Sequence, residues 1–130
     1  MFSRRHVVAG ALAVPFFPTS PATSYDAAQE IAECCASLAR LFPSSLDAVR
    51  GLGLVCRECG DSSTARAALI DALCPDAQTR ALVARGNDEE VRCWADAKIR
   101  ADFAAGRVAR LDGWVLAETE VRLYTLLADM

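Results

Sequence analysis

The sequence predicts a mainly α protein, a small helical bundle of about six helices with a short C-terminal β-hairpin before the last helix. Three observations support this fold class. Apolar residues recur every three or four positions through most of the chain after residue 25, as they do on the buried face of a helix. Glycine or proline follows most of these runs, where helices usually end. Near the C-terminus, one Asp-Gly pair separates two short runs of β-forming residues, which is the pattern of a hairpin.

Three helices are predicted in the first half of the chain. The first covers 26–41, and its apolar face is formed by Ile31, Cys34, Cys35, Leu38 and Phe42. The second covers 46–59 and stops before Gly60, a residue that tolerates the left-handed conformation found after helices. The third begins among the capping side chains of "DSST" and ends at Leu73, shortly before a proline.

Two further helices precede the hairpin. A short one is predicted over 77–85 and ends at Gly86. The next begins at Asn87, whose side chain can form a capping box with Glu90, and it closes at Gly106. The acidic residues of its first turn suit the positive end of the helix dipole, so we do not interpret them as a catalytic cluster.

The hairpin is predicted from strands over 107–111 and 114–116, joined by Asp112 and Gly113. A two-residue type I′ turn needs positive φ at both central positions, and Asp-Gly tolerates this well. A two-stranded ribbon is only marginally stable alone. We therefore expect Trp114 to pack the hairpin onto the helices.

The last helix is predicted over 118–129. Its polar side chains form one narrow stripe, made of Glu118, Arg122, Thr125 and Asp129. Glu118 can pair with Arg122, and Glu120 suits a capping position in the first turn. Apolar residues cover most of the remaining surface, so we expect this helix to lie at the centre of the domain. The alternative is that part of this surface is a partner interface.

The N-terminus has the three parts of a cleavable secretory signal: a basic start, a short apolar run over 7–17, and the small-residue segment "PTSPATS". The apolar run is too short to span a bilayer, so we expect no stable membrane span after cleavage. Cleavage after Ser24 would leave one helical domain over 25–130. The segment "SRRHVV" resembles the twin-arginine consensus at five positions: Ser3, Arg4, Arg5, Val7 and Val8. This resemblance implies export to the periplasm by the twin-arginine (Tat) translocase; a general secretory signal with two arginines is the alternative.

Removal of 1–24 would change both the reactive side chains and the net charge of the protein. His6, the single histidine, would be removed with the signal. The remaining domain would then lack the usual base of Ser-His and Cys-His nucleophiles, and it would lack the usual imidazole ligand for metals. Two of the 14 basic residues and none of the 17 acidic residues lie in this segment, so the net charge of 25–130 is −5. Such a domain has no basic footprint for nucleic acid or anionic membrane. We expect no enzymatic activity and no cofactor.

Six cysteines lie in the predicted domain: Cys34, Cys35, Cys56, Cys59, Cys74 and Cys93. In an oxidising periplasm such a set favours structural disulfides, and a bridge from the first helix to the second or fifth is the expected form. Six cysteines allow 15 pairings, and the sequence does not choose among them. Cys56 and Cys59 form a CxxC, but it closes a helix instead of opening one, which is unlike a thioredoxin motif. A four-cysteine metal site or a thiol redox centre is the alternative.

The stretch 99–128 resembles the C-terminal part of small Tat-exported bacterial proteins of unassigned activity. The shared pattern is D-F-x-x-G-R, then D-G-W-x-L, then T-E-x-R-L, and it covers about a quarter of this chain. Ala117 departs from a serine in that pattern, which implies a weaker start for the last helix. The resemblance implies a structural motif in which Asp112, Gly113, Trp114 and Glu120 provide a turn, an anchor and a cap.

These observations predict an exported, non-catalytic accessory or interaction protein. By size and export route the chain is similar to small Tat-targeted subunits of larger bacterial redox enzymes, so a larger protein partner is expected. The alternative is a cysteine-based metal-binding or thiol redox protein.

Overall fold

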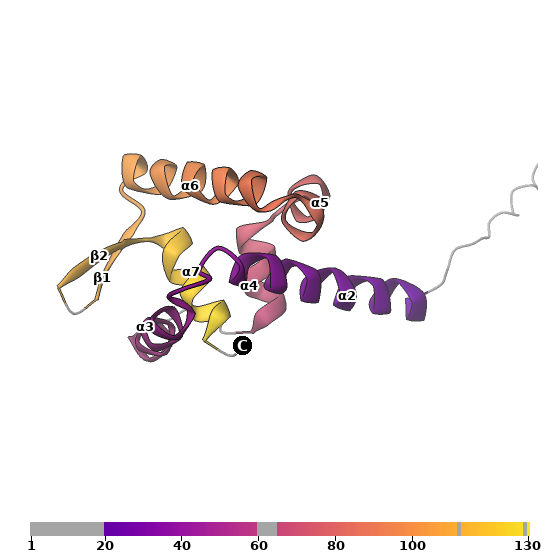
Figure 1. Ribbon diagram of the computed structural model, residues 1–130, viewed down its shortest axis with the longest axis horizontal. Helices are drawn as coiled ribbons and strands as arrows, with labels where there is room; N and C mark the ends of the chain where they lie inside the picture. Colours follow the sequence, from indigo (N-terminus) through magenta and orange to yellow (C-terminus); the bar gives the residue numbers. More distant parts are fainter. Residues whose placement is uncertain (1–19, 60–64, 112, 129) are drawn as a thin grey trace, which may run out of the picture.

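The structure is a computed structural model that describes residues 20–59, 65–111, 113–128 and 130. This part of the chain is mainly helical, with six helices and a two-stranded antiparallel hairpin before the last helix, which confirms the predicted fold class (Figure 1). The elements are α2 (Ser20–Ala39), α3 (Leu46–Cys59), α4 (Arg66–Leu73), α5 (Ala77–Arg85), α6 (Asp88–Ala105), β1 (Val108–Leu111), β2 (Trp114–Ala117) and α7 (Glu118–Leu127).

The boundaries of α3 and α5 are those that the glycines and apolar spacing predicted, whereas α2 differs. It begins at Ser20 and ends at Ala39, so it starts and stops earlier than the predicted 26–41. The predicted cleavage point after Ser24 therefore lies within this helix. The five residues of the predicted export signal, namely Ser3, Arg4, Arg5, Val7 and Val8, lie outside the described residues.

Among the described helices, an N-cap side chain marks the starts of α5 and α6. The Asn87 side chain accepts a hydrogen bond from the Glu90 backbone N–H (2.8 Å), and the Glu90 carboxylate accepts one from the Asn87 N–H (2.9 Å), forming the predicted capping box of α6. This helix ends at Gly106, whose φ of 76° is the left-handed conformation that glycine adopts without a Cβ penalty. The start of α4 differs from the prediction, because its N-cap is Ala65, without a side-chain cap, and "DSST" lies outside the described residues.

The hairpin has the predicted register. Leu111 pairs with Trp114, which leaves two residues for the turn. Gly113 has a φ of 84°, as the turn requires. Asp112 lies outside the described residues. The second strand continues one residue beyond the prediction, to Ala117, and α7 follows at once.

Helix α7 lies at the centre of the domain, as its wide apolar surface predicted. It contacts four helices, α2, α3, α4 and α6, and both strands (Figure 1). Its closest approach is to α3 at Gly53, where an added Cβ would overlap the backbone carbonyl of Tyr124. The buried core around α7 draws on every other helix, and its fully buried large side chains include Leu38, Ile70, Leu73, Val83, Val91, Leu123 and Leu127.

One member of the predicted polar stripe of the last helix is buried. Thr125 is 6% exposed, and its hydroxyl donates to the Val121 carbonyl at 2.7 Å. This bond to the preceding turn satisfies the hydroxyl within the helix, so burial leaves no polar group unpaired. The polar stripe predicted a solvent-facing position for Thr125, so other elements cover more of the surface of α7 than expected.

Candidate functional site

The tryptophan of the hairpin faces solvent. Trp114 is 66% exposed, so the prediction that it packs the hairpin onto the helices is wrong. Phe103 is 47% exposed at the end of α6. The hairpin is instead held by its direct continuation into α7 and by Leu116 and Ala117, which are buried. Both aromatic rings are thus available at the surface.

Trp114 and Phe103 line one open groove, which we call the hairpin groove. Its volume is about 420 Å³. It is formed by α3, α6, β2 and α7, which contribute Leu52, Phe103, Trp114, Val115, Leu116, Glu120 and Tyr124. Five of these seven side chains are apolar. Soluble domains rarely gather exposed tryptophan, phenylalanine and valine in one concave place unless something binds there.

A carboxylate and a phenol form the polar part of the hairpin groove. The Tyr124 hydroxyl donates to Glu120 Oε2 at 3.3 Å, one helical turn away on α7. Burial, followed by the nearby charge of Glu120, raises the pKa of Tyr124 to about 12, so the phenol stays protonated at neutral pH. The same two residues also line a smaller pocket of about 140 Å³ against Phe42 and α6. The pair therefore lies at the boundary of two hollows.

Glu120 also caps α7. Its Oε1 accepts a hydrogen bond from the Ala117 N–H at 2.8 Å, which is half of a capping box. Ala117 has no side-chain oxygen to complete the other half, in agreement with the weaker helix start implied by the sequence. Each Glu120 oxygen thus has one protein donor. A carboxylate oxygen accepts two hydrogen bonds, so each keeps capacity for a donor from outside.

A buried aspartate positions the groove. Asp102, on α6, is 5% exposed and accepts two hydrogen bonds: from the Thr119 backbone N–H at 2.7 Å and from Arg107 Nε at 3.0 Å. Burial raises the pKa of Asp102, but the bonds from Thr119 and the charge of Arg107 outweigh it and hold the pKa below its ordinary value. This carboxylate joins the end of α6, the start of the hairpin and the first turn of α7. Phe103 at the end of α6 and Glu120 in the first turn of α7 line the groove, so Asp102 joins two of its walls.

The C-terminal pattern noted in the sequence forms one connected unit. Asp102, Arg107 and Thr119 are the junction just described, Gly106 ends α6, and Glu120 caps α7. The pair of Arg122 and Glu118, at 3.5 Å, lies on the same helix. Sequence reasoning missed the role of Asp102. The sequence did contain a sign of this role, because Asp102 and Arg107 are five residues apart and the helix-ending Gly106 lies between them.

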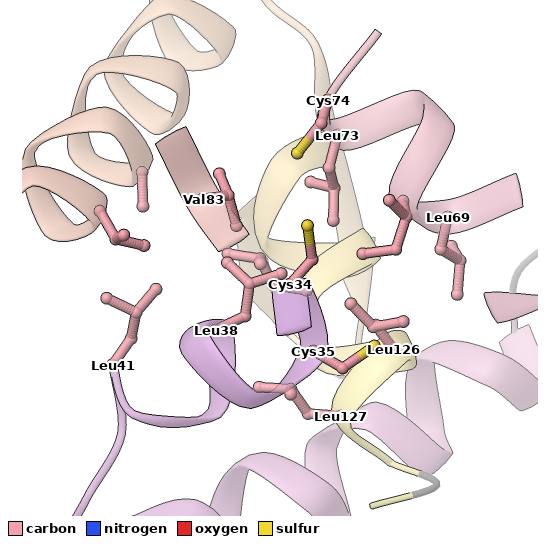
Figure 2. Close-up of a cluster of buried hydrophobic side chains, with 14 of the residues drawn as sticks. Cys34, Cys35, Leu38, Leu41, Leu69, Leu73, Cys74, Val83, Leu126 and Leu127 are labelled. Atoms are coloured by element: carbon pink, nitrogen blue, oxygen red, sulfur yellow. The ribbon is translucent and has the colours of Figure 1, made fainter. Parts of the chain in front are cut away.

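The cysteines are divided among several places. Cys34, Cys35, Cys56 and Cys74 are buried, and Cys93 is exposed on α6. The predicted bridge from the first helix to the second or fifth is not present, and the cysteine that Cys34 meets is Cys74, just after α4 (Figure 2). Among the described residues, no three His, Cys, Asp or Glu side chains gather as a metal site would require. The side chain of Cys59, one of the six cysteines expected in a disulfide or metal site, lies outside the described residues.

Neither family models, nor curated proteins, nor solved structures match this chain. In the described part of the chain, no helix has both the length and the apolar character needed to cross a bilayer.

Proposed function

We propose that the protein is an exported, non-catalytic interaction module that binds a larger protein partner through the hairpin groove. The observation that carries this proposal is the exposure of Trp114 beside Phe103 in a concave, mainly apolar site. Large aromatic side chains held at a surface by rigid elements are the typical anchors of protein interfaces. The proposed partner is a larger redox enzyme, by analogy with small subunits of similar size and predicted export route.

The chemistry of the groove suits an apolar segment that carries one basic side chain. Glu120 is the charged residue among the groove's lining residues, and both of its oxygens have capacity for a further donor. A lysine or arginine placed between apolar contacts would reach this carboxylate from a partly desolvated position. The net charge of the whole chain, −3, also favours a basic partner surface.

A thiol redox function is less well supported by the described cysteines. A redox-active cysteine needs a sulfur that an outside thiol can reach. Cys34 and Cys74 are each 0% exposed, and Cys93 is exposed on α6 as a free thiol.

The test is purification of the tagged full chain from its native cells, with identification of co-purifying proteins by mass spectrometry. Trp114→Ala should lose a partner that the wild type retains at constant stoichiometry, without a change in melting temperature, because the side chain is mostly exposed. Leu54→Ala is the matched control, since Leu54 is 50% exposed on α3 but does not line the groove. Retention of the same partner by Trp114→Ala, or elution of the wild type as a lone monomer, would contradict the proposal.

Glu120→Gln tests the charge alone. Glutamine can still accept the Ala117 N–H bond and so keeps the helix cap. Partner binding should weaken, and its dependence on salt should decrease, because one ion pair has been removed. Unchanged affinity and salt dependence would exclude a basic contact at this position.

Export is tested by replacing Arg4 and Arg5 together with lysine. The n-region keeps its charge, so a general secretory signal would still function. Recognition of paired arginines would be lost, and the protein should accumulate in the cytoplasm. Export at the wild-type level would contradict the Tat route.

A further inference from the structure

We propose that Cys34 and Cys74 are a disulfide-forming pair, and that oxidation joins α2 covalently to the turn between α4 and α5. The inference is independent of the hairpin groove. It rests on the position of two buried sulfurs that are about 40 residues apart in the sequence.

The two thiols are in hydrogen-bond contact inside the core. Figure 2 shows the sulfur of Cys34, on α2, and the sulfur of Cys74, just after α4, pointing toward one another. Cys34 Sγ donates to the Arg80 carbonyl at 3.6 Å, so the Cys74 thiol is the donor to the Cys34 sulfur. A disulfide needs two such sulfurs on facing side chains, with little backbone movement.

Arg80 holds both partners in place. Its backbone carbonyl accepts from the Cys34 thiol, and its guanidinium donates to the Cys74 carbonyl at 3.0 Å. The same guanidinium lies 3.5 Å from Glu30, one turn before Cys34 on α2. A single residue of α5 therefore fixes α2 against the residue that follows α4. Two cysteines held in this way lose little further conformational freedom when a disulfide joins them.

The other described cysteines have different surroundings. Cys35 is next to Cys34 in the sequence, but neighbouring helical residues point about 100° apart, and Figure 2 shows it directed away from Cys74. Cys93 is exposed on α6. Among Cys34, Cys35, Cys74 and Cys93, the contact thus selects one pairing.

In the packed core, the electrostatics distinguish the two sulfurs. The hydrogen bond from Cys74 lowers the pKa of Cys34, and the positive charge of Arg80 acts in the same direction. The same hydrogen bond, together with burial, raises the pKa of Cys74. In the packed core, Cys34 is therefore the more acidic of the two thiols.

The oxidant is a disulfide, such as glutathione disulfide or a disulfide-bearing oxidase. With α2 separated from the α4–α5 turn, one of the two cysteines loses its proton to solvent, attacks one sulfur of this oxidant as a thiolate, forms a mixed disulfide and releases the first external thiolate. The other cysteine then loses its proton to that thiolate and attacks the protein sulfur of the mixed disulfide. This releases the second external thiolate, which takes up the first proton from solvent. Two protein thiols are oxidised and one external disulfide is reduced to two thiols. Because both protein sulfurs are buried, exchange occurs while α2 is separated from the α4–α5 turn.

The experiment is refolding of the unfolded full chain in a mixture of glutathione and glutathione disulfide, followed by alkylation, tryptic digestion and mass spectrometry. Trypsin places Cys34 in peptide 6–40 and Cys74 in peptide 67–80. The expected product is these two peptides joined, with a mass two hydrogens below the sum of the free peptides. The oxidised protein should melt more than about 10 °C above the reduced protein, because the bridge closes a long loop.

Peptide 6–40 also contains Cys35, which provides a matched control. Cys35→Ser should keep the joined peptides and the gain in melting temperature, whereas Cys34→Ser should lose both. Fragmentation of the wild-type product between residues 34 and 35 identifies the bonded cysteine even where a variant fails to fold. A bridge to Cys35, a different partner for Cys74, or complete alkylation of both peptides in the folded protein would overturn the proposal.

Discussion

Replacement of Asp102 tests the junction that positions the hairpin groove. The substitution Asp102→Ala removes the acceptor of the Thr119 N–H, which is buried, and of the Arg107 guanidinium, whose side chain is half exposed. A hydrogen bond to a charged acceptor contributes about 1.5–3 kcal/mol. The half-exposed ion pair adds at most about 1 kcal/mol. The expected loss of unfolding free energy is therefore about 2–4 kcal/mol.

The assay is thermal and urea unfolding followed by circular dichroism. The predicted loss corresponds to a decrease in melting temperature of roughly 10–20 °C for a domain of this size. Asp102→Asn should lose less, because its amide oxygen can still accept the Thr119 N–H bond. Asp96→Ala, at an exposed position on the same helix, is the control and should unfold like the wild type. A melting temperature for Asp102→Ala within about 2 °C of the wild type would refute the reasoning.

The lowered pKa of Asp102 also predicts a dependence on pH. A carboxylate with a lower pKa in the folded state stabilises the fold fully above its unfolded pKa of about 4. That stabilisation is lost as the pH falls through the lower folded pKa. The difference in unfolding free energy between the wild type and Asp102→Asn should therefore shrink between about pH 5 and pH 2. If this difference in unfolding free energy is constant over the range, the charge of Asp102 does not contribute to stability.

Two further predictions concern the helix contacts around the groove. Gly53→Ala should destabilise the protein by about 1–3 kcal/mol or more, because the new Cβ would overlap the Tyr124 carbonyl. Gly51 lies on the same helix, but a Cβ added there meets no other atom. Gly51→Ala should therefore stabilise the protein by about 0.5–1 kcal/mol. Urea unfolding of both variants measures this, and equal effects would contradict the close approach of α3 and α7. Ala117→Ser supplies the missing half of the capping box with Glu120 and should stabilise the protein by about 0.5–1 kcal/mol in the same assay. If stability does not increase, the buried serine hydroxyl does not reach the N–H groups of the first turn of α7.

Helix boundaries could be predicted where the determinant lies within a few residues of the boundary. The capping box of Asn87 and the left-handed Gly106 define α6 by local hydrogen bonds and backbone sterics, and both were visible in the sequence. The Asp-Gly turn determines the hairpin register in the same way. The start of α2 was predicted less well, since the small residues before Asp26 carry no strong stop signal for a helix.

The candidate site was predictable only in part. The sequence identified Trp114 and Glu120 as notable residues, and the capping role of Glu120 follows from its place in the first turn of α7. The exposure of Trp114 was not predicted, because strand alternation does not say which face of an isolated hairpin meets the core. Asp102 was not predicted either, since Thr119, the donor of its shorter hydrogen bond, lies 17 residues further along the chain, beyond the hairpin.

The sequence by itself determined the class of the fold, the order of its elements and most of their ends, because these follow from periodicity, capping and turn chemistry. The tertiary structure decided which side of the hairpin is open, and that α3 and α7 meet closely at Gly53. It also decided that Cys34 meets Cys74, among 15 formal pairings of six cysteines. These outcomes depend on how whole helices pack against one another. Contacts between residues about 40 positions apart leave no local pattern in the chain.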